Sequence, residues 1–156
     1  NNIKVFTNPL TNKSKKFLMM KHNEFIEGGA LNSFGENLNF EGKEQSYPMK
    51  YQLFGLSIKD ILDDKILEIP DYIKIDVDGI EHIILSGAEN YLKDPNIKSI
   101  SVEINENFKT QFSNIIEIMK KNNFSFLEKK QNDELKNSSG PFSKSFNYIF
   151  EKKRNL

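Results

Sequence analysis

An apolar strand pattern that ends in acidic residues and runs directly into a helix pattern constrains this chain most. Residues 72–77 are rich in β-branched side chains and are followed by Asp78 and Gly79, which predicts a β-strand closed by a turn. Apolar residues then recur at every third or fourth position. This spacing predicts a helix over 80–92 that Asp78 or Gly79 caps and the Asp94-Pro95 pair ends. The stripe consists of Ile80, Ile83, Ile84, Gly87, Ala88, Tyr91 and Leu92.

The remaining patterns extend this order of strands and helices in both directions. Alternating apolar residues predict a strand over 97–104, and helical spacing of apolar residues predicts a helix over 108–119. Two further strands are joined by a polar loop without a helix pattern, so we expect them to form an antiparallel hairpin. The other predicted elements are the hairpin strands at 124–127 and 146–150, a strand at 51–56, a helix capped jointly by Ser57 and Asp60, and short strands at 3–6 and 17–20.

This order predicts one α/β domain over 1–156, with a mostly parallel sheet and an antiparallel C-terminal hairpin. The stretches at 27–46 and 131–141 are loops by composition.

The net charge is 0, with 22 basic and 22 acidic residues, which argues against general binding to nucleic acid or to anionic membranes. There is no apolar run long enough to span a membrane. The absence of Cys fits a reducing compartment, so we expect a cytoplasmic protein.

Acidic residues gather where two of the predicted strands end. In an open parallel sheet, ligands bind outside the carboxyl ends of the strands, and neighbouring strands lie about 5 Å apart. If these two strands are neighbours, five acids converge on one rim. Carboxylates there can accept hydrogen bonds from ribose hydroxyls, from an ammonium group or from a substrate hydroxyl. The acids are Asp76, Asp78, Glu81, Glu103 and Glu106, with His82 and Asn105 beside them.

Most of these residues also have a purely structural explanation. Asp78 precedes a helix and could cap it, Glu81 is favoured by the helix dipole whatever else it does, and Glu103 could lie on a solvated side of its strand. His82 is expected to be an exposed residue of the first helical turn. Asp76 is different, because it ends an apolar strand where packing alone favours an apolar or turn residue. We therefore predict a functional role for Asp76.

The Asp-Val-Asp-Gly segment at 76–79 also matches parts of two metal-dependent motifs. An EF-hand loop needs further oxygen ligands and a Glu at its twelfth position, whereas an apolar helix pattern begins at Ile80. The segment is also similar to the first motif of haloacid-dehalogenase-type phosphatases, in which Asp76 would be the nucleophile and Asp78 an acid, with magnesium. That alternative stays open. A zinc site would need His22, His82 and distant carboxylates, and we expect no metal.

The junction resembles the signature of FkbM-family methyltransferases. That signature combines a Lys-Ile-Asp-Val-Glu-Gly-x-Glu strand-to-helix junction, matched here at 74–81, with a Leu-x-Gly-Ala helix segment, matched at 85–88. Glu103 matches the acid of the family's next strand, and residues 56–62 are similar to the family's preceding strand-to-helix segment. The resemblance covers nearly the whole chain and is strongest over 51–105.

The resemblance implies a Rossmann-like fold of the class I methyltransferase type and methyl transfer from S-adenosylmethionine. The family commonly methylates a hydroxyl oxygen on a sugar or natural product. We therefore expect Asp76, Asp78 and Gly79 to bind the cofactor. Glu81 or Glu103 is expected to face the acceptor as a catalytic residue. The alternative to an enzyme is a catalytically silent α/β module that acts by association.

The start of the sequence departs from the family pattern. Members begin with a strand, a Gly-rich turn and a helix, whereas the first strand candidate here, at 3–6, matches the family's third strand. We therefore expect an N-terminally truncated domain that binds S-adenosylmethionine very weakly. The strand at 72–77 would lack a neighbour on one side, and two copies of the chain are expected to pair across this edge as a homodimer. Acceptor specificity is expected in the loops at 21–50 and 131–143.

Overall fold

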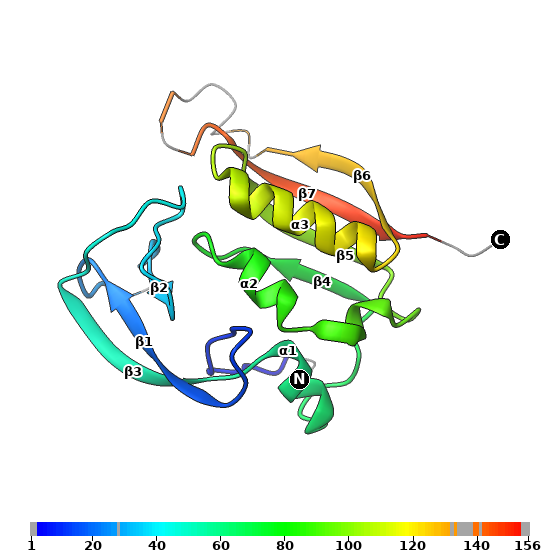
Figure 1. Ribbon diagram of the computed structural model, residues 1–156, viewed down its shortest axis with the longest axis horizontal. Coiled ribbons are helices and arrows are strands. Elements are labelled where there is room, and N and C mark those ends of the chain that lie inside the picture. Colours follow the sequence, from blue (N-terminus) through cyan, green and yellow to red (C-terminus); the bar gives the residue numbers. More distant parts are fainter. Residues whose placement is uncertain (1–2, 28, 132, 134–138, 141, 154–156) are drawn as a thin grey trace.

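The computed structural model describes residues 3–27, 29–131, 133, 139–140 and 142–153; Gly28 and most of the loop expected at 131–141 lie outside them. The strands are β1 (Lys16–His22), β2 (Ser33–Phe34), β3 (Met49–Gly55), β4 (Tyr72–Ile75), β5 (Ser99–Asn105), β6 (Phe124–Lys130) and β7 (Ser145–Lys152). They form a four-stranded sheet of order β4-β5-β7-β6 and a three-stranded sheet of order β2-β1-β3 (Figure 1).

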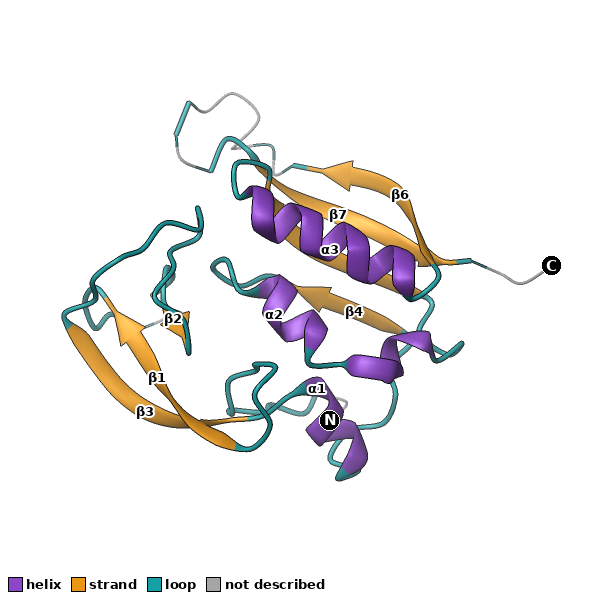
Figure 2. Cartoon of the chain, viewed as in Figure 1, coloured by secondary structure: helices purple, strands orange, loops and turns teal. Residues whose placement is uncertain are grey.

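The helices are α1 (Ile58–Asp63), α2 (Glu81–Ser86) and α3 (Lys109–Lys121), with a short 3₁₀ helix, η1 (Glu89–Lys93). Strands and helices alternate through the middle of the chain, so the predicted α/β class is confirmed. Helices α2 and α3 lie side by side over one face of the four-stranded sheet (Figure 2). Within the described ranges, there is no helix long and apolar enough to cross a membrane.

The four-stranded sheet differs from the mostly parallel sheet that the sequence predicts. Among the described strands, β4 and β5 form the one parallel pair, in which Tyr72 lies opposite Ser99 and Ile75 opposite Val102. Strands β5 and β7 pair antiparallel, as do β6 and β7, so the predicted C-terminal hairpin is confirmed. The strand expected at 51–56 exists as β3, but it pairs antiparallel with β1 along seven residue pairs. It therefore contributes nothing to the main sheet.

The core lies between the four-stranded sheet and helices α2 and α3. Ile100, Val102 and Ile104 on β5 are fully buried on the helix-covered face, as the alternation of apolar residues predicts. Ile115 and Met119 of α3 pack into the same cluster. Burying one such side chain contributes roughly 1.5–3 kcal/mol relative to leaving it exposed. This cluster holds the ends of β4 and β5 at fixed positions.

The helix predicted over 80–92 is interrupted. Helix α2 ends at Ser86, and the chain continues through Gly87 and Ala88 into η1. The interruption coincides with a close approach, because a Cβ atom added to Gly87 would lie 2.5 Å from the main-chain oxygen of Thr11. Glu89 also has a φ of 47°, which is incompatible with a regular right-handed helix. The predicted apolar stripe still points inward, since Ala88 and Leu92 are buried.

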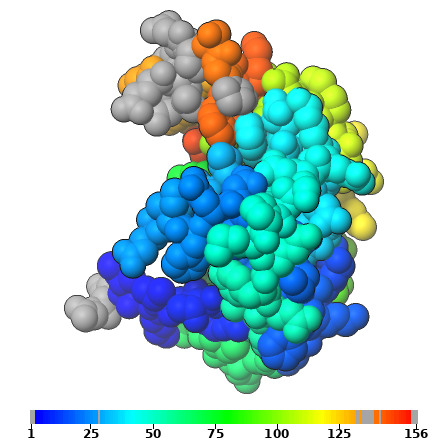
Figure 3. Space-filling model, turned by 90° about the vertical axis from the view of Figure 1, so that its left-hand side faces the viewer, coloured from blue at the N-terminus to red at the C-terminus, as the bar shows by residue number. Residues whose placement is uncertain are grey.

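The N-terminal third of the chain forms a separate layer. Leu18, Met20 and Leu53 from β1 and β3 pack against the main core, and the segments coloured blue and cyan cover much of the face seen in Figure 3. The expectation of a strand at 3–6 is wrong. These residues form no strand in the structure, and Ile3 and Val5 are each 84% exposed. Without a neighbouring strand, this short segment has no hydrogen-bonding partner that would define it as one.

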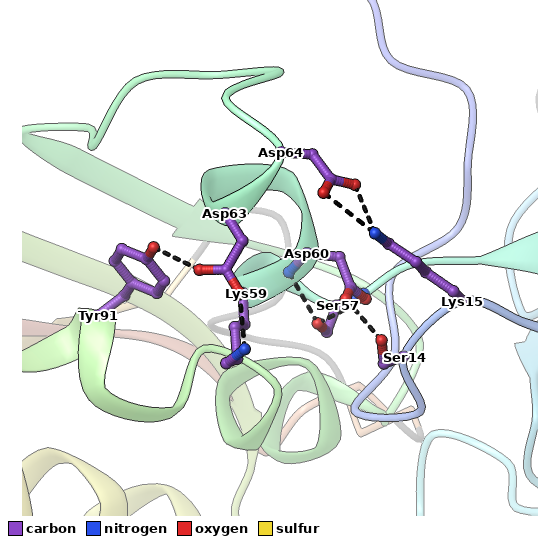
Figure 4. Close-up of polar contacts among 8 residues, drawn as sticks. All are labelled: Ser14, Lys15, Ser57, Lys59, Asp60, Asp63, Asp64 and Tyr91. Atoms are coloured by element: carbon purple, nitrogen blue, oxygen red, sulfur yellow. Dashed lines mark hydrogen bonds and ion pairs between the residues drawn. The ribbon is translucent and has the colours of Figure 1, made fainter.

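Helix α1 begins at the predicted capping box. The Oγ atom of Ser57 accepts a hydrogen bond from the Asp60 N–H at 3.0 Å, and the Asp60 carboxylate accepts one from the Ser57 N–H at 2.8 Å. Ser14 donates its hydroxyl hydrogen to the same carboxylate at 2.6 Å, and Lys15 pairs with Asp64 at 2.7 Å (Figure 4). The turn before β1 is thereby attached to α1. The confirmed cap orders both segments at once.

Candidate functional site

The predicted convergence of acids follows from the pairing of β4 with β5. Because these strands are parallel neighbours, the residues after Ile75 and those at the end of β5 share one edge of the sheet. Asp76 directly follows β4, and its carboxylate lies 2.6 Å from the ammonium group of Lys74. Its side chain is 43% exposed. Asp76 is therefore available to a ligand at the rim.

Asp78 has a role that sequence patterns did not indicate. Its Oδ2 atom accepts hydrogen bonds from the backbone N–H groups of Leu31 at 2.5 Å and Asn32 at 3.2 Å. Helix α2 instead begins after Ile80, which provides no side-chain cap, so the expectation that Asp78 or Gly79 caps this helix is wrong. Asp78 holds the loop before β2 against the rim, and this contact fixes the direction of its carboxylate.

Gly79 is required by the backbone at this junction. Its φ of 104° lies in a region that residues with a Cβ atom rarely adopt. A Cβ atom there would also lie 2.9 Å from the Cα atom of Phe40 and 3.0 Å from the main-chain oxygen of Asn39. The junction therefore turns sharply beneath the 39–40 segment.

Glu81 is buried, with 1% of its surface exposed. Its Oε1 atom accepts hydrogen bonds from the N–H groups of Val77 at 3.2 Å and Gly79 at 3.4 Å. Its Oε2 atom accepts one from the side-chain amide of Gln111 at 2.5 Å. Burial raises the pKa of Glu81 to about 8, and the backbone N–H donors oppose this rise only in part.

Glu103 lies on the face of β5 opposite the buried Val102 and Ile104, and it is partly exposed. Burial raises the pKa of Glu103, and the negative charges of Asp76 and Asp78 raise it further. The parallel pairing of β4 with β5 brings the acids of both strand ends close enough to influence one another. Glu103 therefore holds a proton more readily than an exposed Glu does.

The fifth acid and the two histidines do not join this group. Glu106 turns toward Lys129 and Tyr148, and its Oε1 atom lies 2.5 Å from a polar atom of each. His82 is half-buried rather than exposed, packs edge-on against Phe108, and has a pKa lowered by burial. His22 stacks on Tyr51 in the other sheet. Among the residues that the structure describes, there is no group of three or more His, Cys, Asp or Glu that could hold a metal ion.

A groove of ≈ 660 Å³ runs along the open edge of β4. Residues 73–78 line it consecutively, so the strand presents its edge rather than one face. The groove is mostly apolar along its length, and Asn32, Asp76 and Asp78 form its polar end. The apolar lining includes Leu10, Met20, Phe34, Ile58, Ile61, Leu62, Ile73, Ile75, Ile80, Ile84 and Leu92.

The other side of the rim is closed. The rings of Phe40 and Phe142 stack with their centroids 4.5 Å apart, and both residues line a small cavity with Glu81, Glu103 and Asn105. The main-chain oxygen of Phe40 accepts a hydrogen bond from the Asn105 amide at 3.4 Å. The rim thus has an open side at Asp76 and a covered side at Glu81.

A comparison with protein families gives this geometry a context. The FkbM methyltransferase domain matches residues 15–126, more than two-thirds of the chain. The chain belongs to the FkbM methyltransferase family. No curated protein and no solved structure matches it. In this FkbM-family protein, the matched range contains the rim carboxylates and most of the residues that line the groove.

Two residues of the candidate site had no signal in the sequence. Gln111 contacts Glu81 from α3, and Phe40 covers the junction from a loop far away along the chain. The helical pattern placed Gln111 near the start of a helix, but only tertiary packing shows that it is buried. Neither the structure nor the family match supports the phosphatase alternative for Asp76 and Asp78.

Proposed function

We propose that this FkbM-family protein binds S-adenosylmethionine in the groove beside β4 and directs its methyl group to a hydroxyl oxygen of a sugar or natural product. The observation that carries the proposal is the polar end of the groove. Asp76 and Asp78 come from the family's signature junction, and Glu103 lies on the adjacent strand. We also propose a cytoplasmic location, which the absence of Cys favours.

The residues of the groove suit this cofactor. Its volume of ≈ 660 Å³ is within the range of roughly 300–1,000 Å³ typical of small-molecule sites. The apolar walls suit a purine ring, and the exposed carboxylate of Asp76 can accept hydrogen bonds from an ammonium group or from ribose hydroxyls. When bound, S-adenosylmethionine supplies an electrophilic methyl group. Asp78 and Gly79 shape the polar end, since the Oδ2 atom of Asp78 holds the N–H groups of Leu31 and Asn32 and Gly79 lets the backbone turn there.

Glu103 is the better candidate for the acceptor side. Methyl transfer to oxygen gains from removal of the acceptor's proton, and positioned bases typically contribute about 10²–10⁴-fold. The raised pKa of Glu103 makes it a stronger base than an exposed Glu. Glu81 has only 1% exposure and three donors on its carboxylate. We therefore assign the acceptor-facing role to Glu103 and a supporting role to Glu81.

Titration calorimetry with S-adenosylmethionine tests the proposal. Asp76→Asn should weaken binding by about tenfold or more, since a charge-assisted hydrogen bond contributes roughly 1.5–3 kcal/mol. Asp71→Asn is a matched control, because Asp71 is also an exposed acid 2.6 Å from a lysine, Lys98, but lies at the opposite end of β4. We expect weak wild-type binding. Equal affinities of the two variants would contradict the placement of the cofactor.

The open edge of β4 favours association of two copies as the second candidate function. Its backbone groups have no strand partner on the groove side among the described strands, and pairing two like edges would satisfy both. Lys74 and Asp76 alternate along this edge, so an antiparallel register can place each lysine opposite the aspartate of the other copy. The expected assembly is a homodimer.

Light scattering with size-exclusion chromatography tests this association. The wild-type chain should have the mass of a dimer, and Lys74→Glu should shift it to a monomer because acids would then face each other. Lys98→Glu is the matched control, because Lys98 directly precedes β5 and pairs with Asp71 beside the opposite end of β4, and it should leave the dimer intact. A wild-type monomer at all concentrations would exclude this interface. A dimer that does not bind S-adenosylmethionine would favour association over catalysis.

A further inference from the structure

A chain of buried hydrogen bonds connects the two segments that carry the rim carboxylates. Glu81 accepts hydrogen bonds from the N–H groups of Val77 and Gly79 in the loop after β4. Gln111 donates from Nε2 to Glu81, and its Oε1 atom accepts the N–H of Asn105, at the end of β5, at 3.0 Å. The Gln111 side chain on α3 is therefore bonded directly to the end of β5 and, through Glu81, to the loop after β4.

The side chains that form the bridge are shielded from water. Glu81 and Gln111 are each 1% exposed, and Asn105 is 4% exposed. Buried polar groups are costly unless they are hydrogen-bonded. Here the Gln111 side chain uses its oxygen toward one segment and its amino group toward the other, so a rotation of the amide by 180° would place donor against donor at Asn105. The polarity of the bridge is thus fixed by its neighbours.

Helix α3 gives the bridge a rigid base. Ile115 and Met119 lie one and two turns after Gln111, and both are buried in the main core. Gln111 therefore has a position that the core determines, independently of the loops it contacts. A change at this side chain would be transmitted to both loops.

We propose that Glu81 and Gln111 are positioning residues, a rim clamp that sets the spacing between the Asp76–Asp78 loop and the strand end that carries Glu103. The role of this clamp rests on the proposed function, because the spacing matters only if the Asp76–Asp78 loop and Glu103 both act on bound molecules. Neither residue touches the open groove's polar end. They act through the backbone of Val77, Gly79 and Asn105.

Exchanging the two side-chain types tests the clamp. In the double variant Glu81→Gln/Gln111→Glu, every hydrogen bond can be kept. The amide oxygen at 81 would accept the N–H groups of Val77 and Gly79, its amino group would donate to the carboxylate at 111, and that carboxylate would accept the N–H of Asn105. Each single variant instead places two amide donors, or two buried acids, against each other.

The first measurement is hydrogen exchange and carboxyl-carbon NMR without any ligand. Each single variant should speed exchange at Val77, Gly79 and Asn105 about tenfold or more, and should shift the carboxyl signals of Asp76 and Glu103. The double variant should restore both. The exposed substitution Gln52→Glu on β3 is the control and should change neither. If the single variants do not fold, the double variant decides alone: native rim signals support the clamp, and an unfolded protein overturns it.

The second measurement is affinity for S-adenosylmethionine, which separates this proposal from the proposed function. Gln111→Glu should weaken the binding of S-adenosylmethionine, and the double variant should restore it. A double variant no better than the worse single variant would overturn the clamp. Restored NMR signals with no binding in any form would contradict the proposed function alone, and wild-type affinity in Gln111→Glu would remove the positioning role.

Discussion

Strand β4 has a different environment on each of its two sides. On one side it pairs with β5, and the sheet continues through β7 to β6 over a buried apolar core. On the other side it borders a groove of ≈ 660 Å³ whose far wall comes from α1 and the segment around Leu10. The rim has the same division, since Glu81 is enclosed and Asp76 is exposed.

This difference separates support from recognition. On the enclosed side, the side chains of Glu81 and Gln111 are hydrogen-bonded to protein atoms, so they hold the loops in place and have little capacity left for a ligand. The open side has an exposed carboxylate beside an apolar groove, which is the usual character of a ligand site. Side chains with similar chemistry therefore have different roles, determined by burial rather than by residue type.

The largest expected effect comes from a core substitution on the paired side. Ile104→Ala should lower the free energy of unfolding by about 2–5 kcal/mol, the usual cost of removing a buried Ile side chain. Ile104 has 0% exposure. Ile73→Ala on β4 should cost about half as much or less, because Ile73 is only partly buried and lines the groove. Equal losses in urea unfolding would show that the two sides of β4 are equally packed.

The enclosed acid predicts an unusual pH dependence. Glu81 has a pKa of about 8 in the folded protein, against an ordinary value of 4.5, so the folded state retains a proton that the unfolded state releases between these values. Stability from this group is therefore full below pH 4.5 and is lost as the pH rises toward 8. The loss should be on the order of a few kcal/mol, at about 1.4 kcal/mol per pKa unit.

The Glu81→Gln variant isolates this contribution. Its free energy of unfolding should be lower than that of the wild type by an amount that shrinks as the pH rises from 4.5 to 8. Other acids whose pKa is lowered on folding change both proteins equally, so the difference reports on residue 81. A difference that stays constant over this range would mean that Glu81 remains ionised in the folded protein.

A methyl group at the junction should affect both sides of the rim. Gly79→Ala should cost about 1–3 kcal/mol, since a residue with a Cβ atom is strained at a φ of 104° and would meet the backbone at Phe40. Gly140→Ala is the control, because an added Cβ atom there has nothing within 4 Å. Thermal unfolding of the two variants measures the contrast. Equal melting temperatures would show that the junction can relax.

The smallest expected effect concerns the far wall of the groove. Ser57→Ala removes the cap of α1 and should cost about 1 kcal/mol. Because Ile58, Ile61 and Leu62 line the groove, S-adenosylmethionine affinity should fall with it. Ser113→Ala, on the exposed surface of α3, is the control for loss of a hydroxyl. A loss of stability with unchanged affinity would show that α1 is not part of the binding wall.

Patterns with short spacing predicted part of the fold well. The β4–β5 pair, the C-terminal hairpin and the Ser57 cap depend on alternation, helical spacing or residues three apart, and all three are present. The partner of β3 could not be predicted in this way, since its pairing with β1 depends on residues more than 25 positions apart. The break at Gly87 has the same origin, because the segment that approaches it is Thr11.

The site shows the same limit. Asp76, Asp78, Glu81 and Glu103 were recognisable as one group because each lies near the end of a predicted strand or the start of a helix. Their individual roles were not, since the sequence contains no sign that Leu31 and Asn32 bind Asp78 or that Gln111 binds Glu81. Burial of a polar side chain depends on packing across the whole molecule. The residues that form the group were therefore more predictable than the role of each one.

The contact between Gly79 and the 39–40 segment has a consequence for engineering new specificity. Phe40 lies over Gly79 with its backbone, stacks on Phe142 with its ring, and accepts a hydrogen bond from Asn105 with its carbonyl oxygen. Four segments that are distant along the chain thus meet at one residue. A loop transplanted from a relative to change the acceptor would have to bring a residue that satisfies all of these neighbours, so single-loop exchange is a poor route and coordinated exchange a better one.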